Sequence, residues 1–312
     1  MDYLPVVLVL LGTLSSCLAG APRTTTPTTT PTDELSFQAM VAAPVNFSSE
    51  SRIVGGQAAN PGQFPHQVAM VVEAGEGAGR ETSFCGGSIL TETIVVTAAH
   101  CIPSETRKIT VYAGANSIHD EPTKQELEVD SFIVHGGFSK YRNDIALVLL
   151  NTSLQFNERV QAIQLPPKDV GALVGSKVVM SGWGRTTTHG DISPVLRYVE
   201  SYVLPNPVCQ LPYLLLMQID ESHVCVSGLF KKGTCMGDSG GPLSTIKGKD
   251  GNATLVGITS FGMKYSCLVS WPPVFTRVAS FLGWIEDGME QLQGKRRPEG
   301  VKHLSRSTTR TP

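Results

Sequence analysis

The sequence predicts an all-β fold for the body of this chain. Short runs rich in β-branched residues, separated by Gly, Pro and Asn, recur along most of it, and this spacing is typical of β-sandwiches and β-barrels. The clearest helical periodicity lies late in the chain, at 280–293. With 41% hydrophobic and 17% charged residues in a length of 312, the chain can bury a full-sized core.

Residues 1–19 are expected to form a signal peptide. An apolar run at 4–14 leads to small residues that end at Ala19, which is the pattern of a secretory core followed by its cleavage site. The alternative is a membrane anchor, which would need about 20 apolar residues, and the polar residues at 15–16 interrupt the run early. We therefore expect a secreted, extracellular protein with no membrane partner.

Residues 20–52 are expected to form an exposed pro-segment. They are poor in periodic apolar residues, and the Thr- and Pro-rich tract at 24–32 is unable to pack a core. The composition changes at Arg52, where one basic residue precedes Ile53, Val54 and two glycines. The folded domain is expected to begin at this change.

Eight short runs after this point are expected to form strands. They lie at 67–72, 88–96, 108–113, 128–134, 145–150, 177–181, 255–260 and 274–278. Near the end, Phe281, Trp284, Ile285 and Met289 recur at helical spacing, which predicts one C-terminal helix packed on the domain.

The segment 289–312 is expected to be a basic, disordered tail. Its basic residues are Lys295, Arg296, Arg297, Lys302, Arg306 and Arg310. A charge run of this kind is typical of a solvated extension, which can also be removed by processing; a binding site is the alternative.

The charge balance and the scattered histidines exclude several classes of partner. The 25 Lys and Arg residues nearly balance the 27 Asp and Glu residues, so no global field favours nucleic acid or an anionic membrane. Five histidines show no paired ligand spacing: His66, His119, His135, His189 and His223. We therefore expect no catalytic metal, no cofactor and no nucleic-acid partner.

The cysteines and the glycosylation sequons agree with secretion. Once Cys17 has left with the signal peptide, six cysteines remain and permit three bridges, although their spacing does not choose among the pairings. They are Cys85, Cys101, Cys209, Cys225, Cys235 and Cys267. Three Asn-x-Ser/Thr sequons, at Asn46, Asn151 and Asn252, predict a glycoprotein.

Three segments carry the residue types that amide hydrolysis requires. The reaction needs a strong nucleophile, a base that takes its proton, and donors aimed at the oxyanion. His100 lies in Thr-Ala-Ala-His-Cys, Asp144 in Asn-Asp-Ile-Ala-Leu, and Ser239 in Gly-Asp-Ser-Gly-Gly-Pro. The order His, Asp, Ser along the chain is one of the known orders of a catalytic triad.

At these residues the chain resembles the chymotrypsin/trypsin family of serine proteases, in particular the chymotrypsin-like digestive enzymes of invertebrates. Three further segments strengthen the resemblance: Ile-Val-Gly-Gly at 53–56, Phe-Cys-Gly-Gly-Ser at 84–88 and Ser-Gly-Trp-Gly at 181–184. The resemblance covers the domain at 53–288. It implies two packed six-stranded antiparallel β-barrels with a C-terminal helix, the active site between them, and the bridges Cys85–Cys101, Cys209–Cys225 and Cys235–Cys267.

The resemblance also assigns roles in catalysis. Ser239 would attack the scissile carbonyl, His100 would take its proton and return it to the leaving amine, and Asp144 would hold the imidazole tautomer. The backbone N–H groups of Gly237 and Ser239 would form the oxyanion hole, and a side chain at position 237 would obstruct that turn.

A further implication is activation by proteolysis. Cleavage after Arg52 would free the amine of Ile53, which in this family turns inward and pairs with the carboxylate beside the nucleophile, here Asp238. An enzyme whose pocket rejects Arg would not cut its own bond after Arg52 efficiently, so a separate trypsin-like protease is expected to make this cut.

The pocket implied by the resemblance has Gly233 at its floor, where trypsins carry Asp. Without that carboxylate, desolvating a substrate Lys or Arg would be costly. The walls would come from Ser260, Phe261, Gly262 and the segment around Pro273. Gly262 leaves the entrance open for apolar or aromatic side chains, as in chymotrypsins, whereas the ring of Pro273 could shorten the pocket and favour smaller residues, as in elastases.

Two other functions remain as alternatives. The chain could be an inactive homologue that acts as an extracellular binding module, although such proteins usually lack a triad residue. It could also be a protease with one regulatory target, yet the pro-segment lacks the cysteine-rich modules that often accompany that role. We therefore expect a monomeric digestive or general endopeptidase acting on polypeptides and open to inhibition by proteins.

Overall fold

The computed structural model describes residues 56–118, 122–187, 190–229, 233–246, 251–262, 270–294 and 300–304. The predicted signal peptide and pro-segment lie outside these ranges. So do Asn46, Arg52, Ile53, His119, His189 and Cys267.

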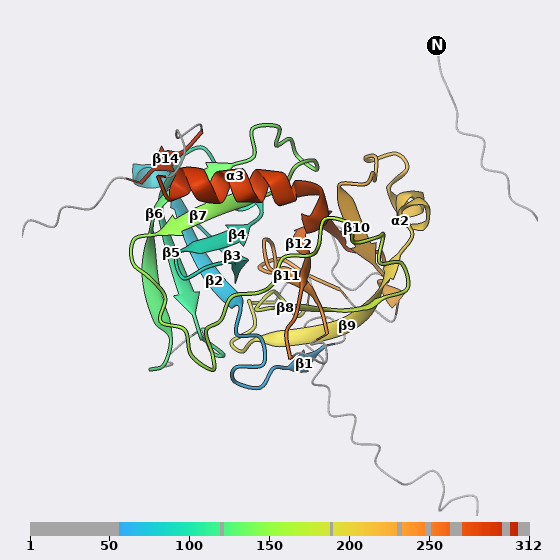
Figure 1. Cartoon of the computed structure of the whole chain (residues 1–312), viewed down its shortest axis with the longest axis horizontal. Helices are drawn as coiled ribbons and strands as arrows, with labels where there is room; N and C mark the ends of the chain where they lie inside the picture. The colour runs from blue at the N-terminus through green and yellow to red at the C-terminus, as the bar shows by residue number, and fades with distance from the viewer. Residues whose placement is uncertain are drawn as a thin grey trace, which may run out of the picture. The chain divides into compact units, whose positions relative to one another are not determined.

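Six strands form the first barrel, and each pairs antiparallel with its neighbours. They are β2 (Gln67–Ala74), β3 (Glu81–Ile89), β4 (Ile94–Thr97), β5 (Thr106–Ala113), β6 (Gln125–Val134) and β7 (Ala146–Leu150). Their order is β6-β5-β2-β3-β4-β7, and the pairing of β6 with β7 closes the barrel. Figure 1 shows this barrel in blue to green.

The second barrel has the same design. Its strands are β8 (Lys177–Gly182), β9 (Arg197–Leu204), β10 (His223–Val226), β11 (Pro242–Thr245), β12 (Leu255–Phe261) and β13 (Val274–Arg277). Their order is β9-β10-β13-β12-β11-β8, closed by the pairing of β8 with β9, and the short β1 (Gln57–Ala58) adds to β9. The predicted pair of six-stranded antiparallel barrels is therefore confirmed.

Each barrel encloses its own apolar core because inward-facing side chains alternate with outward-facing ones. In the first barrel Val68, Met70 and Leu147 are fully buried, and in the second Met180 and Phe275 are. Burying a side chain of this size contributes about 1.5–3 kcal/mol. The two cores together fix the barrels on which the loops of the site are mounted.

Several elements differ from the sequence expectations. The predicted strand at 88–96 is two strands, because Thr91 makes a turn in which its hydroxyl accepts hydrogen bonds from the N–H groups of Thr93 and Ile94. The strands β9, β10 and β11 and the helix α2 (Asn206–Tyr213) were not predicted. The α2 helix contains Pro207 and Pro212, and because proline is unfavourable inside helices, the sequence did not indicate a helix here.

The predicted C-terminal helix is α3 (Leu282–Leu292), which follows the 3-10 turn η4 (Val278–Phe281). It lies across β6 and β7, and Leu282, Ile285 and Leu292 enter the first core. Gly288 allows this close approach, since a Cβ at that position would lie 2.8 Å from Leu147 Cδ1. No helix in the described part of the chain is long and apolar enough to cross a membrane.

Part of the segment expected to be a tail belongs to the fold. The boundary proposed at residue 289 falls inside α3, and β14 (Lys302–His303) pairs antiparallel with β6. The N–H of Leu304 donates to the carbonyl of Asp130 at 2.9 Å. Val301 and Leu304 pack against the first core. The chain after α3 therefore adds a strand to the first barrel.

Candidate active site

Strand pairing in the first barrel brings His100 and Asp144 together. Thr97, the last residue of β4, pairs antiparallel with Ala146, the first residue of β7. His100 follows Thr97 in the 3-10 turn η2 (Ala99–Cys101), and Asp144 precedes Ala146. Because the strands run in opposite directions, both residues leave the barrel at the same end.

The two side chains are in direct contact. His100 Nδ1 lies 2.7 Å from Asp144 Oδ2, and the backbone N–H of His100 donates to Asp144 Oδ1 at 2.9 Å. The carboxylate is 2% exposed, whereas the imidazole is 32% exposed. A hydrogen on Nδ1 satisfies the carboxylate, so the lone pair on Nε2 is available to accept a proton.

The second barrel also holds Asp144. The hydroxyl of Ser260, at the end of β12, donates to Asp144 Oδ2 at 2.5 Å, and the hydroxyl of Thr276 in β13 donates to the backbone carbonyl of Asp144 at 2.8 Å. Sequence reasoning placed Ser260 only in the pocket wall and missed Thr276. Ser260 thus holds the carboxylate of Asp144, and Thr276 holds its backbone, from the second barrel.

The turn that carries Ser239 is attached to the segments that hold the other two residues. The Ser239 carbonyl accepts from the N–H of Gly86 at 2.7 Å, and the N–H of Gly240 donates to the carbonyl of Thr259 at 2.8 Å. Gly86 follows Cys85, which is bridged to Cys101 beside His100. Thr259 precedes Ser260, the donor to Asp144.

Two glycines of this turn have backbone angles that other residues rarely adopt. Gly237 has φ 97° and Gly240 has φ 76°. A Cβ on Gly240 would lie 2.6 Å from the carbonyl oxygen of Gly86, and one on Gly237 would lie 3.1 Å from Ile192 Cγ2. The motif around Ser239 therefore needs glycine at both positions for steric reasons.

The carboxylate of Asp238 is buried behind the turn. It is 1% exposed, and it accepts hydrogen bonds from the N–H groups of Gly184 at 2.8 Å and Cys235 at 2.9 Å. Burial raises its pKa to about 6, although the two N–H groups oppose the shift. A Cβ on Gly182 or Gly184 would overlap the carboxylate, which explains both glycines of Ser-Gly-Trp-Gly.

Of the residues expected to form the pocket, Gly233 and Pro273 lie next to each other, whereas Phe261 packs in a separate aromatic cluster. Gly233 faces Pro273, and a Cβ on Gly233 would be 3.8 Å from Pro273 Cγ. Phe261 instead packs against aromatic rings, with centroid distances of 5.1 Å to Tyr141 and 5.8 Å to Tyr213. A Cβ on the exposed Gly262 would contact nothing within 4 Å.

The sequence did not indicate Tyr213, which packs against the predicted wall residue Phe261. Its hydroxyl donates to the carbonyl of Pro272 at 2.8 Å, and burial raises its pKa well above the usual value. Its ring also lies 5.5 Å from that of Trp271. Tyr213 therefore ties α2 to the segment that leads into β13.

Two of the expected disulfides are present. Cys85–Cys101 joins β3 to η2, and Cys209–Cys225 joins α2 to β10. Cys235 is disulfide-bonded, and Cys267, its expected partner, lies outside the described residues. Asn151 and Asn252 are exposed. In the described ranges no three His, Cys, Asp or Glu side chains gather as a metal ion would require.

Comparison with known proteins agrees with this geometry. The family model described as Trypsin matches residues 53–285. Brachyurin from Leptuca pugilator is 35% identical over 238 residues, which cover 75% of this chain and 97% of that protein. Chymotrypsin-2 from Vespa crabro is 33% identical over 237 residues, which cover 75% of this chain and 98% of that protein.

A solved structure agrees as well. HL collagenase superposes with a TM-score of 0.67 at 28% identity, and the match covers 76% of this chain and 98% of that one. The residues matched by the family model, 53–285, include both barrels and the segments that carry His100, Asp144 and Ser239. The chain belongs to the trypsin family of serine proteases.

Proposed function

We propose that this chain is the secreted zymogen of a serine endopeptidase whose catalytic residues are His100, Asp144 and Ser239. The observation that carries the proposal is the contact between His100 Nδ1 and the buried Asp144 carboxylate, at 2.7 Å. It leaves Nε2 available as a base, on an imidazole that is 32% exposed. The attachment of the Ser239 turn to Gly86 and Thr259 supports the same assignment.

In this mechanism Ser239 Oγ attacks the scissile carbonyl while its proton passes to His100 Nε2. Asp144 stabilises the imidazolium, and the N–H groups of Gly237 and Ser239 donate to the oxyanion, where each donor contributes on the order of 10²–10³ in kcat. His100 then gives the proton to the leaving amine. Water releases the acyl group from Ser239 by the same steps in reverse order.

Activation would follow from cleavage after Arg52 by a trypsin-like protease. The new ammonium group of Ile53 would pair with Asp238, whose carboxylate is buried and has a raised pKa, and would thereby order the turn at Gly237. An unperturbed α-amine titrates near about 8, so we expect activity to fall at alkaline pH as the amine loses its proton. Equal activity after acetylation of Ile53 would contradict this activation step.

The preferred substrates would be polypeptides with an apolar or aromatic residue before the cleaved bond. Gly233 brings no carboxylate to the pocket floor, and Gly262 leaves the wall open. A preference for smaller residues is the second candidate, and the approach of Pro273 to Gly233 favours it. Protein inhibitors of serine proteases are expected partners.

The proposal is tested by activating the purified precursor with trypsin, removing the trypsin and measuring cleavage of peptides that end in Phe, Leu, Ala or Arg. We expect cleavage after Phe and Leu and little after Arg. The Ser239→Ala variant, treated in the same way, is the control and should cleave none of them. A properly cut chain that hydrolyses no peptide would favour the inactive binding module.

A further inference from the structure

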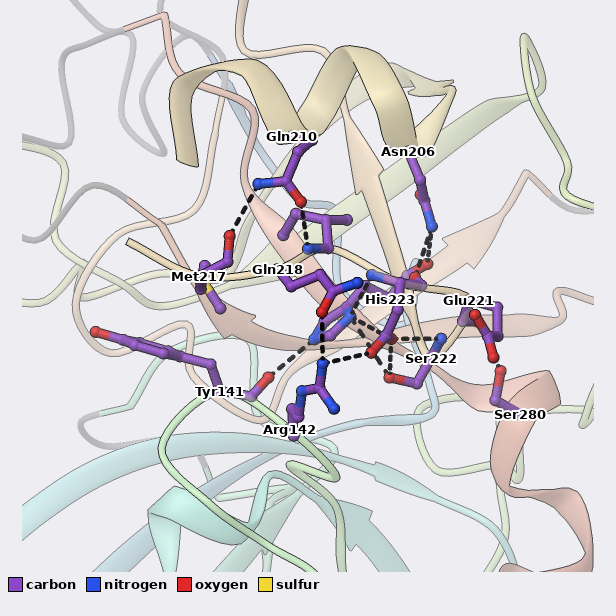
Figure 2. A network of polar contacts seen from close by, with 12 residues as sticks. Tyr141, Arg142, Asn206, Gln210, Met217, Gln218, Glu221, Ser222, His223 and Ser280 are labelled. Atoms are coloured by element: carbon purple, nitrogen blue, oxygen red, sulfur yellow. Dashed lines mark hydrogen bonds and ion pairs between the residues drawn. The ribbon is translucent and has the colours of Figure 1, made fainter. Parts of the chain in front are cut away.

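A second histidine, His223, joins the two barrels beside the site. It is the first residue of β10, and its side chain is 2% exposed. Its Nε2 lies 2.8 Å from the backbone carbonyl oxygen of Tyr141, and its Nδ1 lies 2.8 Å from Asp220 Oδ1. Figure 2 shows the imidazole between the segment of Tyr141 and the turn before β10.

Both ring nitrogens of His223 face acceptors. A carbonyl oxygen only accepts, so Nε2 must carry a hydrogen. The N–H of Asp220 also points at Nδ1, but at the longer distance of 3.2 Å. Nε2 is therefore the hydrogen-bond donor to the Tyr141 carbonyl, while Nδ1 lies against Asp220.

The carboxylate of Asp220 is held in the same network of contacts. Burial acts to raise its pKa, but hydrogen bonds from Ser222 and the charge and hydrogen bond of His223 outweigh burial and hold the pKa below its usual value. Arg142, on the facing loop, lies 3.4 Å from Asp220 Oδ2. Asn206 of α2 donates to the Asp220 carbonyl at 2.6 Å, which fixes the turn itself.

The carbonyl that His223 binds belongs to the loop that leads to Asp144. Ser139 and Arg142 exchange two backbone hydrogen bonds, of 3.1 and 2.6 Å, around Tyr141. Asn143 follows with φ 52°, and the catalytic carboxylate comes next. A shift of Tyr141 would therefore be passed directly to Asp144.

The same loop places the Tyr141 ring against the pocket wall. The ring centroid is 5.1 Å from that of Phe261, and the His223 ring is 6.0 Å from Phe261. Phe261 follows Ser260, the donor to Asp144. His223, Tyr141 and Phe261 thus form one contact group between the first-barrel loop and the second barrel.

Resting on the proposed protease function, we propose that His223 is a positioning residue. Paired with Asp220, it holds the carbonyl of Tyr141 and so fixes the loop 139–143 on the second barrel. It acts on the reaction through this loop, by setting the place of Asp144 and the face that Tyr141 presents beside Phe261.

Three variants of the full chain test this role. His223→Met fills the space and removes both hydrogen bonds, and His223→Gln keeps an amide that can donate to Tyr141. Val224→Ala is the matched control, because Val224 is the next residue of β10, is buried, and faces the core of the second barrel instead. The variants are compared by Tm, by hydrogen exchange of the peptide that covers 139–143, and by kcat and KM after trypsin activation.

We expect faster exchange at 139–143 in His223→Met but not in Val224→Ala at a comparable loss of Tm. The kcat/KM of His223→Met should fall on the order of 10- to 100-fold, the size of effect that a small displacement of catalytic groups produces. Its ranking of peptide substrates should change, and His223→Gln should recover part of the loss. 15N-edited NMR should show a hydrogen on Nε2 of His223, the donor to the Tyr141 carbonyl.

The proposal is overturned if His223→Met matches Val224→Ala in exchange, or if it keeps the parent values of kcat and KM. A His223 ring without a hydrogen on Nε2 would overturn its hydrogen bond to Tyr141. A parent enzyme that neither cleaves peptides nor reacts with an organophosphate would instead refute the protease function, and the exchange measurement would still decide whether His223 holds the loop.

Discussion

The hydroxyl of Ser260 in the second barrel donates a 2.5 Å hydrogen bond to the carboxylate of Asp144 in the first. Asp144 is 1% exposed, so this donor replaces water that the carboxylate has lost. The Asp144 carboxylate is thus held from both barrels, and its position depends on how they pack.

Replacing Ser260 tests this relationship. Ser260→Ala should lower kcat/KM roughly tenfold. A lost hydrogen bond to a charged group costs about 1.5–3 kcal/mol, and we expect only part of this cost to raise the activation free energy of the reaction. Ser201→Ala is the matched control, since it removes a buried hydroxyl that donates to the Ser227 carbonyl away from the site. Equal kcat/KM in the two variants would show that Ser260 has no role in the reaction.

The tautomer of His100 is tested by Asp144→Asn. An amide NH₂ facing Nδ1 would move the ring hydrogen to Nε2, where it blocks proton acceptance, so kcat should fall on the order of 10⁴-fold. Steady-state kinetics with an unchanged Tm would establish the effect. A loss below about tenfold would mean that Asp144 does not set the tautomer.

The steric requirement at Gly240 can be compared with that at Gly262. Gly240→Ala should be destabilised by about 1–3 kcal/mol or more, because φ is positive and the new Cβ would meet the Gly86 carbonyl. Gly262→Ala has open space and should keep the parent Tm while lowering cleavage after large residues. Thermal unfolding gives the Tm of both variants, and equal Tm values would contradict the geometry of the turn.

The carboxyl of Asp238 should titrate near pH 6 in the uncut chain. Its folded-state pKa lies above the unfolded value, so the folded state is favoured most at pH values where this carboxyl keeps its proton in both the folded and the unfolded chain. That contribution is complete below about pH 4 and is lost as pH rises through about 6, an effect of roughly 3 kcal/mol.

Cleavage after Arg52 should change this titration. The ammonium of Ile53 would favour the charged carboxylate and lower the pKa of Asp238. Carboxyl 13C NMR before and after trypsin treatment measures it. The same titration in both forms would mean that Ile53 does not pair with Asp238.

The strand after α3 should stabilise the first barrel without acting in catalysis. Ending the chain at Gly294 removes the pairing of β14 with β6 and the packing of Val301 and Leu304. We expect a loss of about 1–3 kcal/mol, which lowers Tm by several degrees, with kcat/KM unchanged. An unaltered Tm would show that this strand contributes nothing to stability.

Local patterns in the sequence predicted the fold class and singled out His100 and Asp144, whose side chains are in contact. The β4 run and the residues before β7 fix His100 and Asp144 by simple antiparallel pairing. The two-residue β14 could not be predicted, because it exists only through its pairing with β6, far away in the sequence.

The contacts of Ser260 and His223 were hidden for a similar reason. Each acts on the other barrel, Ser260 through the Asp144 carboxylate and His223 through the Tyr141 carbonyl. A single histidine without paired ligand spacing gives no local signal for such a contact. Only the packing of the two barrels reveals it.

Reaction of the trypsin-activated chain with diisopropyl fluorophosphate tests the nucleophile most directly. We predict that mass spectrometry finds one phosphoryl adduct, on Ser239, and that peptidase activity disappears in step with labelling. His100→Ala, cut in the same way, should label far more slowly. A folded and correctly cut chain that leaves Ser239 unmodified would contradict the catalytic assignment.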